Sequence, residues 1–346
     1  MDLKNRCAQL LNTGVSPVLG LLSEQGSRGK REGLSGIRKA APANLVDGLS
    51  VDLEDYYQVE AFAANIPRSR WPLFDSRTRR NTIRTLELLA EHGCRATFFV
   101  LGWIAERDPG LVREVAEAGH ELACHSHLHR PLYDMRPKEF QEDLRRSRDA
   151  IQNAGGTRVV GFRAPTFSIT RETMWALEVL AEEGFEYDSS IFPIHHDNYG
   201  VPSAPRWVHK ERLPSGRNIW ELPPSTVRIG SVNLPFGGGG YLRHLPMFFT
   251  RWAIRTTHGR ERQPVIVYFH PWELDPDQPR LSGSWKSKLR HYRGLNKTAG
   301  RLGEILSRGK FQPLLDLVRA YENRPQPAGD YLPVMQPQGV IGVAAS

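Results

Sequence analysis

Cysteine is scarce in this sequence: Cys7, Cys94 and Cys124 are the only three among 346 residues. They are irregularly spaced and form no Cys-x-x-Cys pair. A disulfide framework needs an even, patterned set of cysteines, and a cysteine zinc site needs closely paired thiols. The sequence therefore indicates neither, and it favours a reducing compartment.

Long apolar runs are also missing. A helix that spans a bilayer needs about 18 or more consecutive apolar residues, and the N-terminal candidate CAQLLNTGVSPVLGLL is interrupted at Asn12, Thr13 and Gly14. No convincing small-residue cleavage site follows it. We therefore expect neither a transmembrane segment nor a signal peptide, and we predict a cytoplasmic protein. The alternative is an envelope-associated protein whose basic leader contacts an anionic membrane surface.

Acidic residues are outnumbered, because 38 Asp and Glu face 46 Lys and Arg, a formal net charge of +8. Such a charge suits an acidic partner, a polyanionic glycan or a nucleic acid among them. The basic residues are scattered in small groups, however, and no nucleic-acid-binding module is recognisable. We interpret them as solvated faces and expect no nucleic-acid partner. The sequence predicts no oligomeric state.

Composition divides the chain into three parts. Residues 1–44 form a basic leader whose second half is rich in Gly, Ser, Lys and Arg and lacks apolar periodicity, which predicts flexibility. Residues 324–346 repeat Pro and Gln and end in small residues, which predicts a disordered tail. One folded domain is expected over residues 45–323.

Within that domain, short apolar runs typical of strands alternate with helical patterns. The expected strands are NLVDGLSVDLED (44–55), CRATFFVLG (94–102), HELAC (120–124), RVVGF (158–162) and PVIVYFH (264–270). Apolar residues at helical spacing fall between them, over residues 83–90, 111–116, 140–151 and 170–184. This alternation predicts an α/β fold with a parallel sheet, and the number of units favours a barrel over an open sheet. Residues 195–245 break the pattern and predict a β-rich insertion.

Polar residues gather where the predicted strands end, the edge at which parallel α/β folds build their active sites. These residues are Asp52, Glu54, Asp55, His125, His127, His129, Arg163, His270 and Glu273. The spacing of His125 and His129 places two imidazoles on one side of a helical turn, and a carboxylate from another strand would complete a metal site with open positions. A lone His-x-x-x-His can also be an ordinary polar turn. His127 is predicted to point away from that site.

Three acids lie within four residues at the end of the first strand. Asp52, Glu54 and Asp55 repel one another unless a cation compensates them, and Arg163 together with a divalent metal would do so. An exposed acidic turn or helix start is the alternative. The segment PFGGGGYLR lacks the Lys-Ser/Thr ending of a phosphate-binding loop, so it predicts a mobile loop over a groove and not a nucleotide site.

The ordered motifs of the domain resemble those of the polysaccharide deacetylases, the NodB-homology carbohydrate esterases. The matching segments are LSVDLEDYYQVEAF, TFFVLGWIAERDP, GHELACHSHLHRPLYDM, GFRAPTFSIT, YDSSIFP and VIVYFHPWELDPDQPR, within residues 45–275. Their variants look most like the subfamily associated with bacterial exosortase and exopolysaccharide loci. The resemblance implies a distorted (β/α) barrel of about seven parallel strands, with a C-terminal helical extension over residues 276–323.

The resemblance also implies the roles of individual residues. Asp52 resembles the general base, Arg163 the residue that orients it, and His270 the general acid. His125 and His129 resemble the histidines that bind a divalent metal, with zinc as the expected ion. The metal-binding carboxylate departs from the family pattern because Leu53 intervenes, so either Glu54 or Asp55 fits, with Asp55 slightly favoured.

The implied reaction is metal-assisted hydrolysis of N-acetyl groups on N-acetylhexosamine units of a bacterial exopolysaccharide or its precursor. A backbone N–H near Thr166 or Phe167 is expected at the oxyanion. Residues expected to bind or shape the glycan site are Pro165, Phe167, Asp188, Tyr241 and Trp272. Among them, Asp188 is expected to pair with His270, unless it is only a turn acid.

Other functions stay open at this point. Some relatives of this fold hydrolyse small cyclic amides, and a closed pocket would favour that substrate over a glycan. A non-catalytic glycan-binding relative is the other alternative. It would be expected to lack the base or a metal ligand, and both are present in this sequence.

Overall fold

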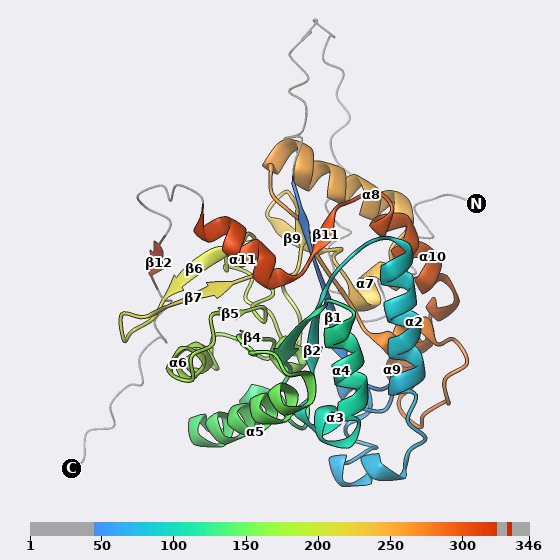
Figure 1. The fold of residues 1–346 in the computed structure, drawn as a ribbon. Helices are drawn as coiled ribbons and strands as arrows, with labels where there is room; N and C mark the ends of the chain where they lie inside the picture. The colour runs from blue at the N-terminus through green and yellow to red at the C-terminus, as the bar shows by residue number, and fades with distance from the viewer. Residues whose placement is uncertain (1–44, 324–330, 334–346) are drawn as a thin grey trace, which may run out of the picture.

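The structure, a computed structural model, describes residues 45–323 and 331–333 (Figure 1). The predicted leader and most of the predicted tail lie outside these residues. No helix among the described residues combines the length and the apolarity that crossing a bilayer requires.

A sheet of seven neighbouring parallel strands curls into a half-barrel and forms the centre of the domain (Figure 1). In spatial order the strands are β10 (Ile266–Phe269), β1 (Asp47–Leu53), β2 (Thr97–Val100), β3 (Glu121–Cys124), β4 (Gly161–Phe162), β5 (Tyr187–Asp188) and β7 (Asn218–Glu221). The α/β barrel with about seven parallel strands is therefore confirmed. The seventh strand comes from within the segment expected to be an insertion, because NIWE pairs in parallel with β5.

Three further strands extend this sheet, and two others form a separate hairpin. β6 (His209–Arg212) runs antiparallel to β7, and β11 (Phe311–Gln312) pairs with the start of β1. β8 (Thr226–Ile229) and β9 (Val232–Pro235) form a separate hairpin. β12 (Tyr331–Pro333) pairs with β6, so the prediction of a wholly disordered tail was wrong for these residues.

Ten α-helices occur among the described residues. They are α2 (Thr78–Glu91), α3 (Gly102–Arg107), α4 (Pro109–Glu117), α5 (Pro137–Gly155), α6 (Trp175–Glu182), α7 (Gly239–His244), α8 (Met247–Thr256), α9 (Trp285–Tyr292), α10 (Leu295–Leu306) and α11 (Leu314–Glu322). The four helical patterns of the sequence correspond to α2, α4, α5 and α6. The helical extension after β10 comprises α9, α10 and α11.

Side chains alternate along β1 between the hydrophobic core on one face of the strand and polar contacts on the other. Leu49, Val51 and Leu53 are fully buried in the main hydrophobic cluster, which includes apolar residues of the covering helices. Ser50 and Asp52 face the opposite, concave side, where both accept hydrogen bonds from Arg163. Side chains on a strand alternate with a period of two. The apolar side chains of β1 therefore face the covering helices, and its polar side chains face the inside of the half-barrel.

The glycine-rich segment packs against β10 instead of forming the predicted mobile loop. The Tyr268 N–H donates to the Gly237 carbonyl (N to O, 2.8 Å), and Gly238 forms a parallel bridge with Tyr268. A Cβ on Gly238 would lie 2.0 Å from the Tyr268 carbonyl oxygen. The glycines therefore permit a close backbone approach, which fixes the start of α7 beside the sheet.

We expect Gly238→Ala to destabilise the fold by at least about 2 kcal/mol, because the added methyl group forces β10 away. Gly300→Ala is the matched control, since it adds a methyl group with no heavy atom within 4 Å, inside α10. That change should leave stability unchanged or raise it by up to about 1 kcal/mol. Urea denaturation of both variants is the measurement, and equal stabilities would refute the packing argument.

Candidate active site

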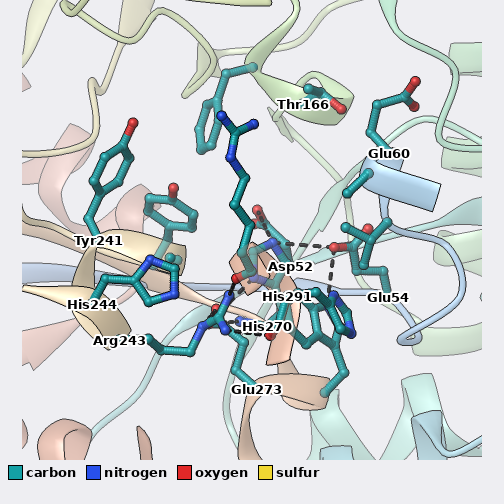
Figure 2. A pocket seen from close by; sticks show the side chains of 18 of the residues that line it. Asp52, Glu54, Glu60, Thr166, Tyr241, Arg243, His244, His270, Glu273 and His291 are labelled. Atoms are coloured by element: carbon teal, nitrogen blue, oxygen red, sulfur yellow. Dashed lines mark hydrogen bonds and ion pairs between the residues drawn. The ribbon is translucent and has the colours of Figure 1, made fainter. Parts of the chain in front are cut away.

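The residues predicted at the strand ends converge on one cavity of about 420 Å³. Asp52 and Glu54 come from the end of β1, His125 and His129 from the loop after β3, and His270 directly follows β10. Residues from the second half of the chain form the other wall, and α7 and α9 contribute to it. Figure 2 shows Asp52, Glu54 and His270 lying close together near the centre of this cavity.

Three of these side chains could hold a metal ion. Glu54, His125 and His129 are all buried, and one ligand atom from each lies within 4.8 Å of the others. The His129 Nε2 to Glu54 Oε2 distance is 3.0 Å, and Glu54 Oε2 has no hydrogen-bond partner. Two imidazoles and one carboxylate form a donor set that suits Zn²⁺ and similar divalent ions. The residues present therefore fit a metal.

Both histidines are held in the neutral form that binds metals. Burial lowers the pKa of His125 to about 4, and burial followed by the charge of His125 lowers the pKa of His129 well below its ordinary value. The Arg163 carbonyl lies 2.8 Å from His125 Nδ1. A carbonyl can only accept, so Nδ1 carries the proton and Nε2 offers its lone pair to a metal.

A loop brings His125 and His129 together, so the predicted helical turn was wrong. Ser126 (φ 66°) and His129 (φ 51°) adopt left-handed backbone conformations, which bring the two rings to a centroid distance of 5.2 Å. Arg68 fixes the loop by donating to the carbonyls of Leu128 and His129. His127 points away from the metal cluster, as predicted, and its Nε2 lies 3.6 Å from Glu106 Oε2.

The slight preference for Asp55 as the metal-binding carboxylate is corrected. Asp55 Oδ2 accepts hydrogen bonds from the Ser76 hydroxyl, from the Arg77 and Thr78 amides and from the Thr78 hydroxyl, at 2.8 to 3.2 Å. Asp55 Oδ1 accepts from the Tyr56 amide. These donors surround the first residues of α2, where a carboxylate satisfies amides that lack a helical partner. Asp55 therefore anchors α2, and Glu54 is the carboxylate that faces the histidines.

We expect Glu54→Gln and Asp55→Ala to separate metal binding from stability. Glu54→Gln should weaken Zn²⁺ binding by at least about 100-fold and change the free energy of unfolding by less than about 1 kcal/mol. Asp55→Ala should retain Zn²⁺ affinity but cost about 2 to 4 kcal/mol, because several buried donors lose their acceptor. Calorimetric Zn²⁺ titration and urea denaturation measure the two effects. The reverse pattern would restore Asp55 as the ligand.

Asp52 and Arg163 form a buried ion pair beside the metal cluster. Arg163 Nη1 lies 2.7 Å from Asp52 Oδ1, and the same guanidinium also donates to Ser50 Oγ and to the Ser189 carbonyl and hydroxyl. Burial opposes ionisation of Asp52, but Arg163 and, more weakly, His125 and His270 hold its pKa below the ordinary value. Asp52 is therefore an oriented carboxylate, with Arg163 placed as predicted.

His270 is paired with carboxylates on two sides. Its Nε2 lies 3.3 Å from Glu54 Oε1 and 3.7 Å from Asp52 Oδ2, and its Nδ1 lies 3.5 Å from Glu273 Oε2. Burial alone would lower the pKa of His270, but Glu54 and Glu273 raise it to about 9. Arg243 Nε lies 2.8 Å from Glu273 Oε1. Against the effect of burial, Arg243 and His270 bring the pKa of Glu273 down to about 2.

The predicted pair of Asp188 with His270 was wrong, since Glu273 takes that place. Asp188 is fully buried on β5, and its carboxylate accepts from the Ser190 amide and hydroxyl. Glu221, its register partner on β7, is also fully buried. Burial raises the pKa of both carboxyl groups, and each group affects the other. The two side chains therefore form a buried acid pair in which the pKa of Glu221 lies well above its ordinary value.

We expect the pair to make stability depend on pH. An unfolded glutamate releases its proton near pH ~4.3, whereas the folded pair retains it, so the free energy of unfolding falls as the pH rises above that value, by up to about 1.4 kcal/mol per pH unit. Glu221→Gln keeps a donor toward Asp188 and removes this slope. Relative to the wild type, the variant should therefore gain stability between pH 5 and pH 8, a trend that the exposed control Glu117→Gln lacks. Parallel pH curves in urea denaturation would rule the pair out.

The residues expected to bind sugar have different surroundings. Tyr241 and Phe167 line the cavity, whereas Pro165 is buried outside its lining. Trp272 lies between His270 and His291, stacked at centroid distances of 5.1 and 4.2 Å. Its faces are therefore covered and cannot stack on a sugar, which corrects that prediction. Its indole N–H instead points at Glu54 Oε1, at 3.3 Å.

Of the two amides expected at the oxyanion, Thr166 is the better candidate. The Phe167 N–H donates to the Ala164 carbonyl. Thr166 and Phe167 both have left-handed backbone conformations, with φ of 57° and 52°, and Thr166 lines the cavity. Strained backbone of this kind is concentrated at functional sites.

Arg243 is the main functional residue that the sequence did not reveal. It is buried, pairs with Glu273, and donates to the carbonyls of Arg290, His291 and Arg293 at the end of α9. It lies 30 residues before its carboxylate partner. No spacing rule connects these positions, so only the fold brings them together.

Comparison with known proteins agrees with this geometry. Residues 67–187 match the polysaccharide deacetylase family, and residues 189–319 match a domain of unknown function, DUF3473. A chitooligosaccharide deacetylase from Rhizobium leguminosarum bv. phaseoli is 36% identical over 191 residues, which cover 54% of this chain and 78% of that protein. The peptidoglycan deacetylase-like protein FGM2 from Gibberella zeae is 28% identical over 155 residues, 40% of this chain and 45% of that protein.

A solved structure shares the fold. A crystal structure from Mycobacterium smegmatis assigned to a polysaccharide deacetylase superposes with a TM-score of 0.53 and 20% identity, covering 83% of this chain and 96% of that chain. The present chain spans less than half the length of several curated relatives that it matches. The similarity to the Rhizobium enzyme covers most of that protein, and the chain therefore belongs to the polysaccharide deacetylase family.

Proposed function

We propose that this protein is a metal-dependent hydrolase that removes N-acetyl groups from N-acetylhexosamine units of a bacterial exopolysaccharide or its precursor. One observation carries the proposal: the Asp52–Arg163 pair, the Glu54–His125–His129 cluster and His270 surround a single cavity. The names of the relatives, which include deacetylases of chitooligosaccharide and peptidoglycan, support the reaction class.

The metal would be held by Glu54, His125 and His129, with zinc as the best-suited ion for this donor set. When bound there, it would polarise the amide carbonyl and lower the pKa of a water molecule toward neutrality. Trp272 donates to Glu54, and the Arg163 carbonyl accepts from His125. These two contacts orient the ligands before a metal arrives.

Asp52 acts as the general base. Its pKa is low enough to keep it ionised at neutral pH, and Arg163 fixes one of its oxygens. The other, Oδ2, faces His270 across the cavity centre and takes the proton from the attacking water. The new C–O bond forms at the acetyl carbon, and the Thr166 amide is placed to stabilise the developing oxyanion.

His270 acts as the general acid. Glu54 and Glu273 favour its charged form, so it carries the proton that the departing amine needs when the C–N bond breaks. Glu273 is in turn held by Arg243. One water is consumed, and the products are acetate and a free amino sugar.

We expect the purified full chain to release acetate from an N-acetylglucosamine oligomer. A chelator should stop the release and zinc should restore it. Asp52→Asn should lower kcat by about 100-fold or more with unchanged zinc content, because Asp52 is a base and not a ligand. The exposed Asp149→Asn variant, which makes the same chemical change, is the matched control and should retain full activity.

Three outcomes would contradict parts of this proposal. Loss of zinc along with activity in Asp52→Asn would make Asp52 a ligand. Hydrolysis of a small cyclic amide, with none of the oligomer, would move the substrate to that class. Acetate release that survives complete removal of the metal would overturn the metal-dependent mechanism.

A further inference from the structure

One rim of the cavity lies between α9 and the short helix η2 (Glu60–Phe62). Residues 59–61 line the cavity at the start of η2, and Leu289 lines it from α9. Ala61 belongs to this lining and is exposed, so the cavity reaches solvent at this rim. Figure 2 shows Glu60 set to one side of the reaction centre.

Contacts at both ends of α9 hold this helix beside η2. The ring centroid of Phe62 lies 5.1 Å from that of His291 and 6.2 Å from that of Tyr292, both in the last turn of α9. Just before α9, a Cβ on Gly283 would lie 2.9 Å from the Phe62 ring. The side chains of α9 therefore project from a backbone whose position relative to the cavity rim is fixed.

Trp285 continues the rim outward from Leu289. It is the first residue of α9 and comes four residues before Leu289. Side chains at this spacing are neighbours on one face of a helix, with about 5 to 6 Å between their Cβ atoms. Helical side chains also lean toward the N-terminus of their helix. Trp285, which is not part of the cavity lining, therefore lies one turn beyond it along the rim.

The ring of Trp285 is open to a ligand. Its side chain is 63% exposed, whereas the ring of Trp272 is stacked between His270 and His291. The ring contact that the structure gives Trp285 is a remote one, with Lys286 Nζ 6.0 Å from the centroid, and Lys286 is itself exposed. Exposed tryptophans are enriched where proteins bind their partners.

We propose that the Trp285 ring is a platform on which a sugar unit of the substrate stacks, outside the cavity and on the same chain as the unit that loses its acetyl group. This inference rests on the proposed deacetylase function and adds that the substrate is a chain long enough to reach the rim. A small cyclic amide held in the cavity does not reach it. Trp285 lies within residues 189–319, so that segment supplies the contact.

The face of a tryptophan suits a pyranose ring. Its π system gives the ring a negative face, whereas one face of a hexose presents C–H hydrogens that carry a small positive charge. Stacking also removes apolar surface of both rings from water. The contact acts far from the bond that breaks. Its loss should therefore appear in KM, while kcat, which depends on Asp52 and His270, changes little.

The test compares acetate release from the dimer and the hexamer of N-acetylglucosamine by the metal-loaded full chain. We expect Trp285→Ala to lower kcat/KM for the hexamer by at least about 10-fold, chiefly through KM. The loss on the dimer should be much smaller, because only the longer oligomer reaches the rim. Trp285→Phe keeps an aromatic face and should retain most of the activity on the hexamer.

Trp252→Ala is the matched control. It makes the same change at another exposed tryptophan, on α8, and should leave kcat/KM for both oligomers within about 2-fold of the wild type. Undiminished turnover of the hexamer by Trp285→Ala would overturn the inference. A loss of equal size on dimer and hexamer would do the same, since it would show a structural role. Both results leave the deacetylase function intact.

Absence of acetate from both oligomers in the wild type would overturn the deacetylase function instead. Calorimetric titration of the wild type and Trp285→Ala with the hexamer then decides the platform separately. Binding at least about 10-fold weaker in the variant would support it. Equal affinities, or no binding to the wild type, would refute it.

Discussion

Buried carboxylates at one edge of the sheet are the constraint on which this site depends. Asp52, Glu54 and Glu273 are each at most 3% exposed, and an ionised carboxylate at such depth is unstable unless a positive charge accompanies it. Arg163 compensates Asp52 and Arg243 compensates Glu273. Burial raises the pKa of Glu54 to about 7. His270 compensates its charge, and a divalent ion held together with His125 and His129 would add to that compensation.

This pattern of compensation joins the two halves of the chain. The first half supplies Asp52, the Glu54–His125–His129 cluster and Arg163, of which His125, His129 and Arg163 lie within the residues that match the deacetylase family. The second half supplies His270, Glu273 and Arg243, and also β7, which completes the parallel sheet. Neither half contains a whole site, so residues 189–319 are part of the active domain and are not an independent appendage.

The sequence revealed the parts of the site that follow from local rules. Apolar strands ending in Asp52, His125, Arg163 and His270 were recognisable, because the carboxyl ends of parallel strands meet at one edge. The choice between Glu54 and Asp55 was not, since the groups that bind Asp55 lie 21 to 23 residues further along the chain.

Long-range packing explains the other errors. Trp272 stacks against both His270 and His291, and His291 comes from α9. Asp188 lies opposite Glu221, on a strand expected to lie in an insertion. Arg243 follows glycines that looked like a flexible loop, yet those glycines serve a close contact with Tyr268. In each case the partner becomes known only once the fold is complete.

We infer that Glu54, His125 and His129 hold the catalytic metal while Asp52 remains free to act as a base. Diffraction from Zn²⁺-soaked crystals, measured at the zinc absorption edge, locates the ion. One anomalous peak about 2.0 to 2.2 Å from Glu54, His125 and His129 is expected, with Asp55 still bound to the start of α2. A zinc ion on Asp55, or none at the three predicted ligands, would refute this assignment.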